Sequence, residues 1–121
     1  MSRTVLYIED DPNSARLVER VLKGPDVHVR VVTNARDGIA AARREPPALI
    51  LLDNHLPDAA GRDVLRELAA SESTRAIPVI ILTGDTDRAT AADLLALGAV
   101  DYIMKPYDIV EFKALIDDHL P

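Results

Sequence analysis

The chain has 121 residues, enough for one domain that buries roughly two-thirds of the surface of its unfolded chain. It contains no cysteine, which excludes disulfides and cysteine-based zinc or redox sites. Its formal net charge of −6 argues against direct contact with nucleic acid. The short apolar runs and the lack of a signal-peptide pattern argue against the membrane and for the cytoplasm.

Five short apolar runs predict the strands of a sheet. In chain order they are Val5–Ile8, Val27–Val32, Ala48–Leu52, Val79–Leu82 and Val100–Met104. The run Val27–Val32 alternates like a strand with one wetter face, which places it near an edge of the sheet. The runs Ala48–Leu52 and Val79–Leu82 are apolar throughout, so we expect both to be buried on two faces.

Five helical patterns follow these runs, each bounded by residues that start or stop helices. They begin at Asp11-Pro12, at Thr33 or Asn34, near Arg62, at Asp85 or Thr86, and at Asp108. Gly24-Pro25 ends the first of them and Gly98 the fourth. The alternation predicts an α/β fold, a doubly wound five-stranded parallel sheet with helices on both faces. We expect residues 1–121 to form this single domain.

Polar side chains follow four of the five predicted strands, at the point where each strand ends. Glu9 and Asp10 follow the first strand, Asp53 the third, Thr83 the fourth and Lys105 the fifth. The carboxyl ends of parallel strands meet at one edge of a sheet, where open sheets place their chemistry. We therefore expect these side chains to converge on one site.

Three of these residues are carboxylates, Glu9, Asp10 and Asp53. Carboxylates brought within a few ångströms repel, which either raises a pKa or requires a cation. Because all the ligands are oxygens, the ion would be Mg²⁺ or Mn²⁺. Glu9 and Asp10 alone could equally favour the positive end of the first helix, but Asp53, on a separate strand, shifts the balance toward a metal site.

Thr83 and Lys105 are weaker signals individually. A lysine after a strand is usually solvated, and a threonine there can simply cap the next helix. Facing an acid cluster, Lys105 can pair with Asp53 and later neutralise an incoming phosphoryl group, while the Thr83 hydroxyl donates to a phosphoryl oxygen. Pro106 allows a cis peptide bond that aims Lys105 inward.

Taken together, these motifs resemble the receiver domain of two-component response regulators. The segments that carry the resemblance are Tyr7–Pro12, Leu51–Pro57 with Gly61, Ile81–Gly84 and Gly98–Pro106, and they extend over essentially the whole chain. The resemblance implies the flavodoxin-like strand order 2-1-3-4-5. It also implies a signalling phosphoacceptor that catalyses its own phosphotransfer and slow autodephosphorylation, and not an enzyme.

The resemblance assigns roles to the acidic residues. Asp53 would take a phosphoryl group from a histidine kinase. Asp10, Asp53 and the backbone carbonyl of His55 would bind Mg²⁺ (or Mn²⁺), with Glu9 acting directly or through water. The positions of His55 and Asp85 resemble those that tune dephosphorylation in the family.

The resemblance also assigns a switch. Thr83 and Lys105 would hold the transferred group, and Tyr102 would turn inward as Thr83 moves toward it. On chemistry alone, Tyr102 could instead lie half-buried beside the last helix.

The implied partners are a histidine kinase or a histidine phosphotransferase, together with a downstream protein. The downstream protein would bind the fourth helix, fifth strand and fifth helix, and a homodimer through the same elements is also compatible. The small apolar residues of this region are either a docking surface or part of the core: Ala89, Ala91, Ala92, Leu95 and Ala99.

Two other functions stay open. One is a small Mg²⁺-dependent phosphohydrolase with an Asp nucleophile, although such enzymes usually carry a second Asp nearby, where this chain has Asn54-His55. The other is a pseudo-receiver scaffold that is never phosphorylated, against which the complete set of acids, Thr83 and Lys105 argues.

Overall fold

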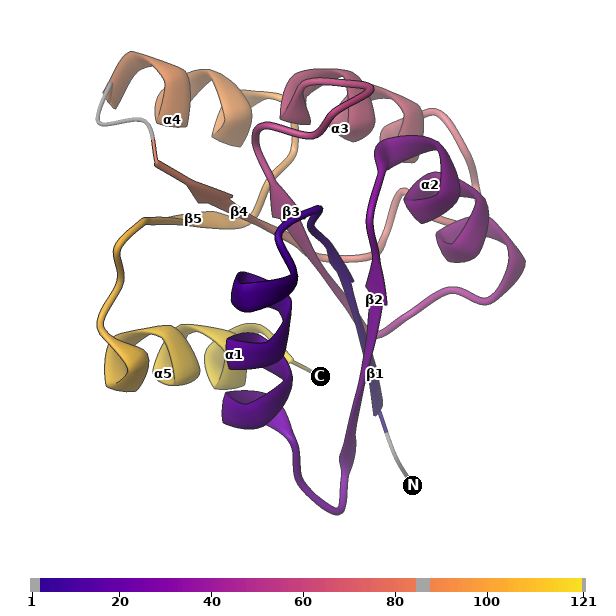
Figure 1. Cartoon of the computed structure of the whole chain (residues 1–121). Coiled ribbons are helices and arrows are strands. Elements are labelled where there is room, and N and C mark those ends of the chain that lie inside the picture. The colour runs from indigo at the N-terminus through magenta and orange to yellow at the C-terminus, as the bar shows by residue number, and fades with distance from the viewer. Residues whose placement is uncertain (1–2, 85–87, 121) are drawn as a thin grey trace.

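The computed structural model describes residues 3–84 and 88–120. These residues form a five-stranded parallel sheet with helices on both faces (Figure 1). Its strands are β1 (Arg3–Ile8), β2 (Val27–Val32), β3 (Leu49–Asp53), β4 (Val79–Thr83) and β5 (Asp101–Met104). The helices between and after them are α1 (Pro12–Leu22), α2 (Ala35–Arg44), α3 (Gly61–Ala69), α4 (Arg88–Ala96) and α5 (Ile109–His119). The predicted α/β class is confirmed.

The strand order is β2-β1-β3-β4-β5, as the resemblance implied. β2 lies at one edge, in agreement with its alternating sequence. β3 and β4 lie inside the sheet, and every residue of both is buried, as their continuous apolar runs predicted. β3 runs one residue past its apolar run, because Asp53 still pairs with Leu82 of β4. Asp53 is therefore the last residue of the strand and not the first of the loop.

The helix starts follow the expected capping chemistry. Asp11 accepts a hydrogen bond from the Asn13 backbone N–H, and Asn34 and Asp108 cap α2 and α5 in the same way. After α4, Gly98 has a φ of 117°, a left-handed conformation that glycine adopts without strain. The caps predicted for α4, Asp85 and Thr86, lie outside the described residues.

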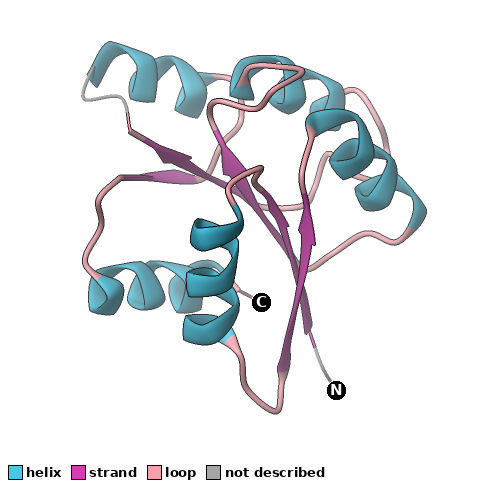
Figure 2. Ribbon diagram, viewed as in Figure 1, coloured by secondary structure: helices cyan, strands magenta, loops and turns pink. Residues whose placement is uncertain are grey.

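Helices cover both faces of the sheet (Figure 2). On each face, a layer of buried apolar side chains lies between the sheet and its helices. Successive side chains of a strand point to opposite faces, so each strand feeds both layers. In β1, Leu6 and Ile8 pack toward α2 and α3, whereas Val5 and Tyr7 pack toward α1 and α5. All four side chains are fully buried. The sheet that carries the polar residues of the carboxyl edge is thus packed on both faces.

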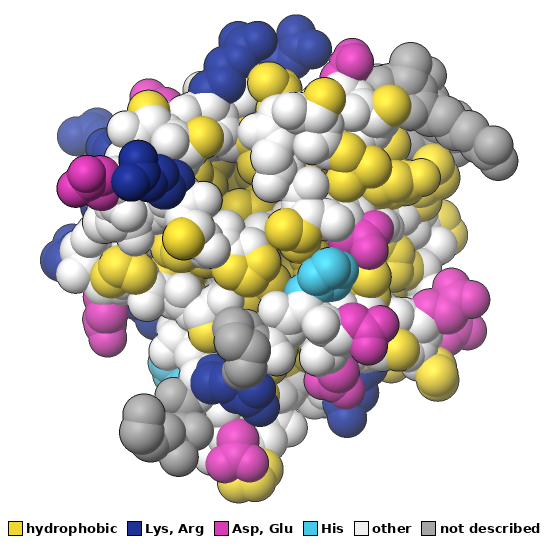
Figure 3. Space-filling model, turned by 180° about the vertical axis from the view of Figure 1, so that it is seen from behind, with side chains coloured by type: hydrophobic (Ala, Val, Ile, Leu, Met, Phe, Trp, Pro, Cys, Tyr) yellow, Lys and Arg dark blue, Asp and Glu magenta, His cyan; other side chains and the backbone are white. Residues whose placement is uncertain are grey.

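Large apolar side chains are exposed on the side formed by α4, β5 and α5 (Figure 3). They are Leu95, Val100, Ile109 and Val110. Ala92 is also exposed, whereas Ala91 and Ala99 are buried in the core. The small apolar residues singled out in the sequence therefore divide between surface and core, and the Ala89 side chain lies outside the part described. No described helix has the length and apolar character needed to cross a membrane.

Candidate functional site

Four adjacent strands deliver polar residues to one edge of the sheet. Glu9 directly follows β1, Asp53 ends β3, Thr83 ends β4, and Lys105 directly follows β5. The ends of β4 and β5 are also joined by a backbone hydrogen bond of 2.7 Å from the Lys105 N–H to the Thr83 carbonyl. The parallel register thus brings together residues that are distant in the sequence.

Three carboxylates form the centre of this edge. Glu9, Asp10 and Asp53 each offer one oxygen, and the three oxygens lie within 4.8 Å of one another. Glu9 and Asp53 are buried, with 1% and 7% of their surfaces exposed, whereas Asp10 is exposed. Two of the three carboxylates are therefore shielded from water, and the cluster is accessible to solvent on the side of Asp10.

Lys105 supplies a positive charge to the cluster. Its Nζ lies 2.8 Å from Glu9 Oε1 and 3.8 Å from Asp53 Oδ1. The predicted ion pair with Asp53 is therefore present, and Lys105 in addition donates a hydrogen bond to Glu9. The Glu9 carboxylate is the more deeply buried of the two, and Asp53 Oδ1 also accepts the backbone N–H of His55 at 3.3 Å. The Lys105-Pro106 peptide bond is cis.

Tyr7 also contacts the cluster, although it was not among the predicted site residues. Its hydroxyl donates to Glu9 Oε1 over 3.2 Å, and the whole side chain is buried. A signal was present in the sequence, because a tyrosine two residues before Glu9 in a strand projects from the same face. Apolar packing alone would have been served as well by the leucine or valine that neighbouring positions use.

Burial and neighbouring charge change the pKa values of the cluster. Burial, reinforced by Glu9, raises the pKa of Asp53 to about 7, although Lys105 opposes the change. Burial also pushes the pKa of Glu9 upward, but Asp53, Lys105 and Tyr7 outweigh it and leave that pKa below its usual value. Without a cation, Asp53 therefore keeps its proton to a higher pH than an ordinary carboxyl group, whereas Glu9 stays ionised.

The cluster fits a divalent cation. Among the described residues, Glu9 Oε2 is buried without a hydrogen-bond partner, and such oxygens are rare in folded proteins. The other oxygen of the same carboxylate already accepts from Tyr7 and Lys105. An all-oxygen set with one unsatisfied member suits Mg²⁺ or Mn²⁺, which bind one or two carboxylates and keep several waters.

The remaining predicted residues lie around this cluster. Thr83 is buried at the end of β4, and the His55 side chain is exposed. Tyr102 is half-buried, but it packs with the apolar layer under α2, α3 and α4. It does not lie beside α5, whose buried residues belong to the layer on the other face. Asp85 lies outside the described residues.

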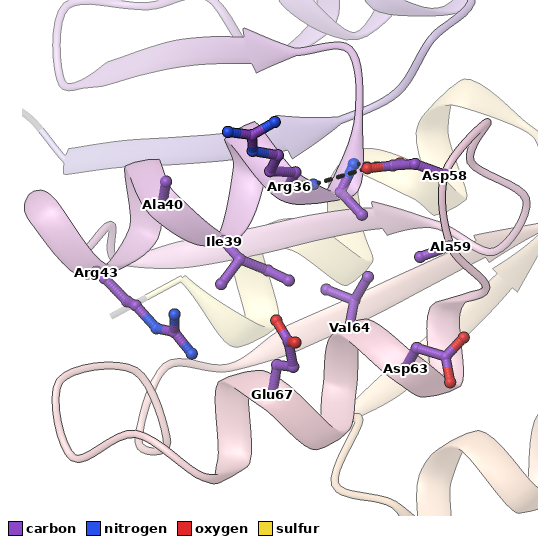
Figure 4. Close-up of a pocket in the computed structure, with 10 residues that line it drawn as sticks. Arg36, Ile39, Ala40, Arg43, Asp58, Ala59, Asp63, Val64 and Glu67 are labelled. Atoms are coloured by element: carbon purple, nitrogen blue, oxygen red, sulfur yellow. Dashed lines mark hydrogen bonds between the residues drawn. The ribbon is translucent and has the colours of Figure 1, made fainter.

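A separate hollow of about 390 Å³ lies between α2 and α3 and shares no residue with the acid cluster. Ile39 and Val64 face each other across it, with Arg43 and Glu67 at its edge (Figure 4). At one end, Asp58 accepts the backbone N–H groups of Ala35 and Arg36 and so caps α2. Asp58 therefore serves the start of α2, and the hollow lies apart from the acid cluster at the sheet edge.

Comparison with known proteins identifies the family. The family model described as the response regulator receiver domain matches residues 5–117. The chain belongs to this family. It is 34% identical over 116 residues to the DNA-binding response regulator MtrA of Mycolicibacterium smegmatis, an alignment that covers 96% of this chain and 50% of MtrA. The chain therefore spans about half the length of the curated relatives it matches.

Solved receiver domains superimpose closely on the structure. The receiver domain of the sensor histidine kinase PA1611 from Pseudomonas aeruginosa, which has a magnesium ion in its active-site cleft, gives a TM-score of 0.88 at 27% identity, covering 99% of this chain and 98% of that one. The BeF3-activated receiver domain of RstA from Klebsiella pneumoniae gives 0.88 at 29% identity and covers 97% of each chain. The protein is thus a receiver domain of two-component signalling.

Proposed function

We propose that this receiver is a phosphoacceptor in which Asp53 takes a phosphoryl group from the phosphohistidine of a histidine kinase or a histidine phosphotransferase. The observation that carries this proposal is the meeting of buried Asp53 with Glu9, Asp10 and Lys105 at one sheet edge. Phosphoryl transfer needs positioning and charge neutralisation more than covalent machinery, and this edge offers both.

Glu9, Asp10 and Asp53 would hold Mg²⁺ or Mn²⁺, with the backbone carbonyl of His55 as a further ligand. The ion supplies positive charge that keeps Asp53 ionised and offsets charge on the phosphoryl oxygens. The exposed Asp10 leaves room for the waters that such an ion retains. The magnesium in the PA1611 receiver supports this assignment.

In the transfer, an ionised Asp53 oxygen forms a bond to phosphorus as the bond between phosphorus and the histidine nitrogen breaks. The released imidazole takes a proton from solvent, and the receiver keeps an acyl phosphate. Lys105 Nζ, 3.8 Å from Asp53 Oδ1, needs only a short movement from Glu9 to reach the phosphoryl oxygens. The Thr83 hydroxyl would donate to another of these oxygens.

The output would follow from the same contacts. Movement of Thr83 toward the phosphoryl group would reposition the half-buried Tyr102 in the neighbouring strand, where it pairs with Ile81. The exposed apolar side chains of α4 and α5 would then dock a downstream protein or a second copy of the chain. The net charge of −6 supports a protein partner over direct nucleic-acid binding, and the chain would act in the cytoplasm.

The test is self-phosphorylation by a small acyl phosphate in the presence of Mg²⁺. Intact-mass measurement should show one added phosphoryl group on the parent and on the control Asp118→Asn, which changes an exposed acid of α5. Asp53→Asn should show none. Labelling that persists in Asp53→Asn would place the acceptor elsewhere, and an unlabelled parent would indicate a scaffold. Release of many phosphates per chain from an added phosphate ester would indicate a phosphohydrolase.

A further inference from the structure

Tyr7 occupies an unusual position for a polar side chain. It lies near the carboxyl end of β1, an internal strand of the sheet, and its ring belongs to the buried layer that packs against α1 and α5. A buried tyrosine hydroxyl requires a hydrogen-bond partner. Here that partner is Glu9 Oε1, at 3.2 Å. The ring is fixed by packing, so the hydroxyl is a fixed donor.

The two carboxylate oxygens of Glu9 differ in their hydrogen bonds. Oε1 accepts two hydrogen bonds, from Tyr7 and from Lys105 Nζ at 2.8 Å. Oε2 is buried and has no partner within the part of the chain described. Both donors therefore hold one oxygen and fix the direction of the other.

We propose that Tyr7 is a positioning residue that fixes the Glu9 carboxylate so that Oε2 is presented to the divalent cation. The proposal rests on the proposed function, because it assumes that the ion occupies the cluster of Glu9, Asp10 and Asp53. Groups that hydrogen-bond to a metal ligand and so orient it contribute to metal affinity, although they do not contact the ion.

The two donors differ in what happens after phosphorylation. Lys105 sits on a half-exposed chain segment and lies 3.8 Å from Asp53, where the phosphoryl group would arrive. When Lys105 turns toward that group, Glu9 Oε1 loses one of its two donors. Tyr7 cannot follow, because its ring is locked between the sheet and the helices. Tyr7 therefore keeps Glu9 oriented while Lys105 serves the phosphoryl group.

The test compares Mg²⁺ binding by the parent and by Tyr7→Phe, measured by calorimetry on the unphosphorylated protein. Phenylalanine keeps the ring in its layer and removes only the hydroxyl. We expect the Kd for Mg²⁺ to rise about tenfold, the scale seen for residues that orient metal ligands. With beryllofluoride, a mimic of the phosphoryl group that engages Lys105, the loss should be larger.

The matched control is Tyr107→Phe. Tyr107 packs at the edge of the same layer and stacks on Phe112 with ring centroids 4.6 Å apart. Among the described residues it makes no hydrogen bond to the acid cluster, so its hydroxyl should be dispensable for Mg²⁺ binding. Equal losses in both variants would mean that any tyrosine hydroxyl of this layer matters, and would overturn the proposal.

A double-mutant cycle separates positioning from a general loss of packing. In the Glu9→Gln background, Tyr7→Phe should no longer change the Kd for Mg²⁺, because the carboxylate that it orients is absent. An undiminished effect in that background would show that Tyr7 acts by another route. The measurements are made well below the melting temperature of each variant, so that only folded protein is titrated.

The result for the parent separates failure of the role of Tyr7 from failure of the proposed function. If the parent binds Mg²⁺ and is phosphorylated on Asp53 while Tyr7→Phe binds Mg²⁺ equally well, only the role of Tyr7 is overturned. If the parent does not bind Mg²⁺ at all, the proposed function and the role of Tyr7 are overturned together.

Discussion

The interior of the sheet and its carboxyl edge differ in chemistry, although consecutive residues of the same strands belong to the two regions. Leu52 and Leu82 are fully buried apolar side chains, and the next residues along the chain, Asp53 and Thr83, are buried polar ones. In the interior each contact stabilises the fold. At the edge, desolvated carboxylates lie close enough to repel, which costs stability.

Within the same strands, the apolar residues therefore stabilise the fold, and the polar residues that directly follow them form the candidate site. Changes in the interior should alter the free energy of unfolding and leave phosphorylation intact. Changes at the edge should instead alter phosphorylation, and those that remove repulsion between carboxylates should also stabilise the metal-free protein. Such a trade of stability for function is common at active sites.

The largest effect is expected in the interior, for Leu51→Ala. Leu51 of β3 is fully buried in the apolar layer under α1 and α5, so its truncation leaves a cavity. Urea denaturation should show a loss of about 3 kcal/mol, while the folded variant still takes one phosphoryl group. Val110→Ala, at a position 78% exposed, should change stability by less than about 0.5 kcal/mol. A folded but unlabelled Leu51→Ala would show that interior and edge are not separable.

At the edge, Lys105→Met should slow self-phosphorylation about 100-fold, equivalent to about 2.7 kcal/mol of transition-state stabilisation. Removal of the ammonium leaves the incoming phosphoryl oxygens without a cationic partner from the chain. The rate is measured by intact mass against time with a small acyl phosphate and Mg²⁺. Lys113→Met removes an exposed lysine of α5 and should react at the parent rate. Equal rates for both variants would remove Lys105 from the mechanism.

Most of the fold could be predicted from the sequence, because strand and helix periodicity are local. The alternation of Val27–Val32 predicted an edge strand, and the continuous apolar runs of β3 and β4 predicted that both strands are buried. Asp53 was recognisable because burying a charged side chain next to an apolar strand is costly unless the charge is paired or binds a metal ion. The boundaries were less certain, because pairing across the sheet decides where a strand ends, as Asp53 shows.

The internal contacts of the site could not be predicted in the same way. The ion pair of Lys105 with Asp53 was predicted, but its closer contact with Glu9 depends on the relative burial of two residues from different strands, and the sequence pattern contains no such information. Tyr7 was missed for a similar reason, since its role depends on which oxygen of Glu9 it meets. Tyr102 was placed beside the last helix as one alternative, whereas the pleat of β5 directs it to the opposite layer.

The raised pKa of Asp53 predicts an unusual pH dependence for the stability of the metal-free protein. Burial raises the pKa of Asp53 to about 7, so the folded state holds a proton that the unfolded chain releases near pH 4. Stability should therefore fall by about 2 kcal/mol as the pH rises from about 5 to 8. Glu9, whose pKa is lowered, has the opposite sign and contributes stability that is lost only at lower pH.

The control for this pH effect is Asp53→Asn, measured by urea denaturation with a chelator present. The variant cannot titrate at residue 53, whereas all three histidines are unchanged and cancel in the comparison. Its stability should be nearly constant between about pH 5 and 8, and should exceed that of the parent at pH 8. Parallel curves for the two proteins would show that Asp53 is ionised throughout this range.

The smallest effect concerns the junction of the two regions, at Gly38 of α2. A Cβ at this position would lie 2.6 Å from Cδ1 and 2.8 Å from Cγ1 of Ile8, the buried residue that precedes Glu9. Alanine favours a helix over glycine by about 1 kcal/mol, but the clash with a packed β1 side chain should cost more. We expect Gly38→Ala to lose about 1 kcal/mol overall by urea denaturation.

Gly24→Ala provides the matched control, because a Cβ there would meet no atom within 4 Å. It should be neutral or gain a few tenths of a kcal/mol from the reduced freedom of the unfolded chain. Because the Ile8 and Glu9 side chains face opposite layers of the sheet, displacement of Ile8 should leave the acid cluster in place. Gly38→Ala should therefore be phosphorylated at the parent rate, and a slower rate would show that strain in the interior reaches the edge through β1.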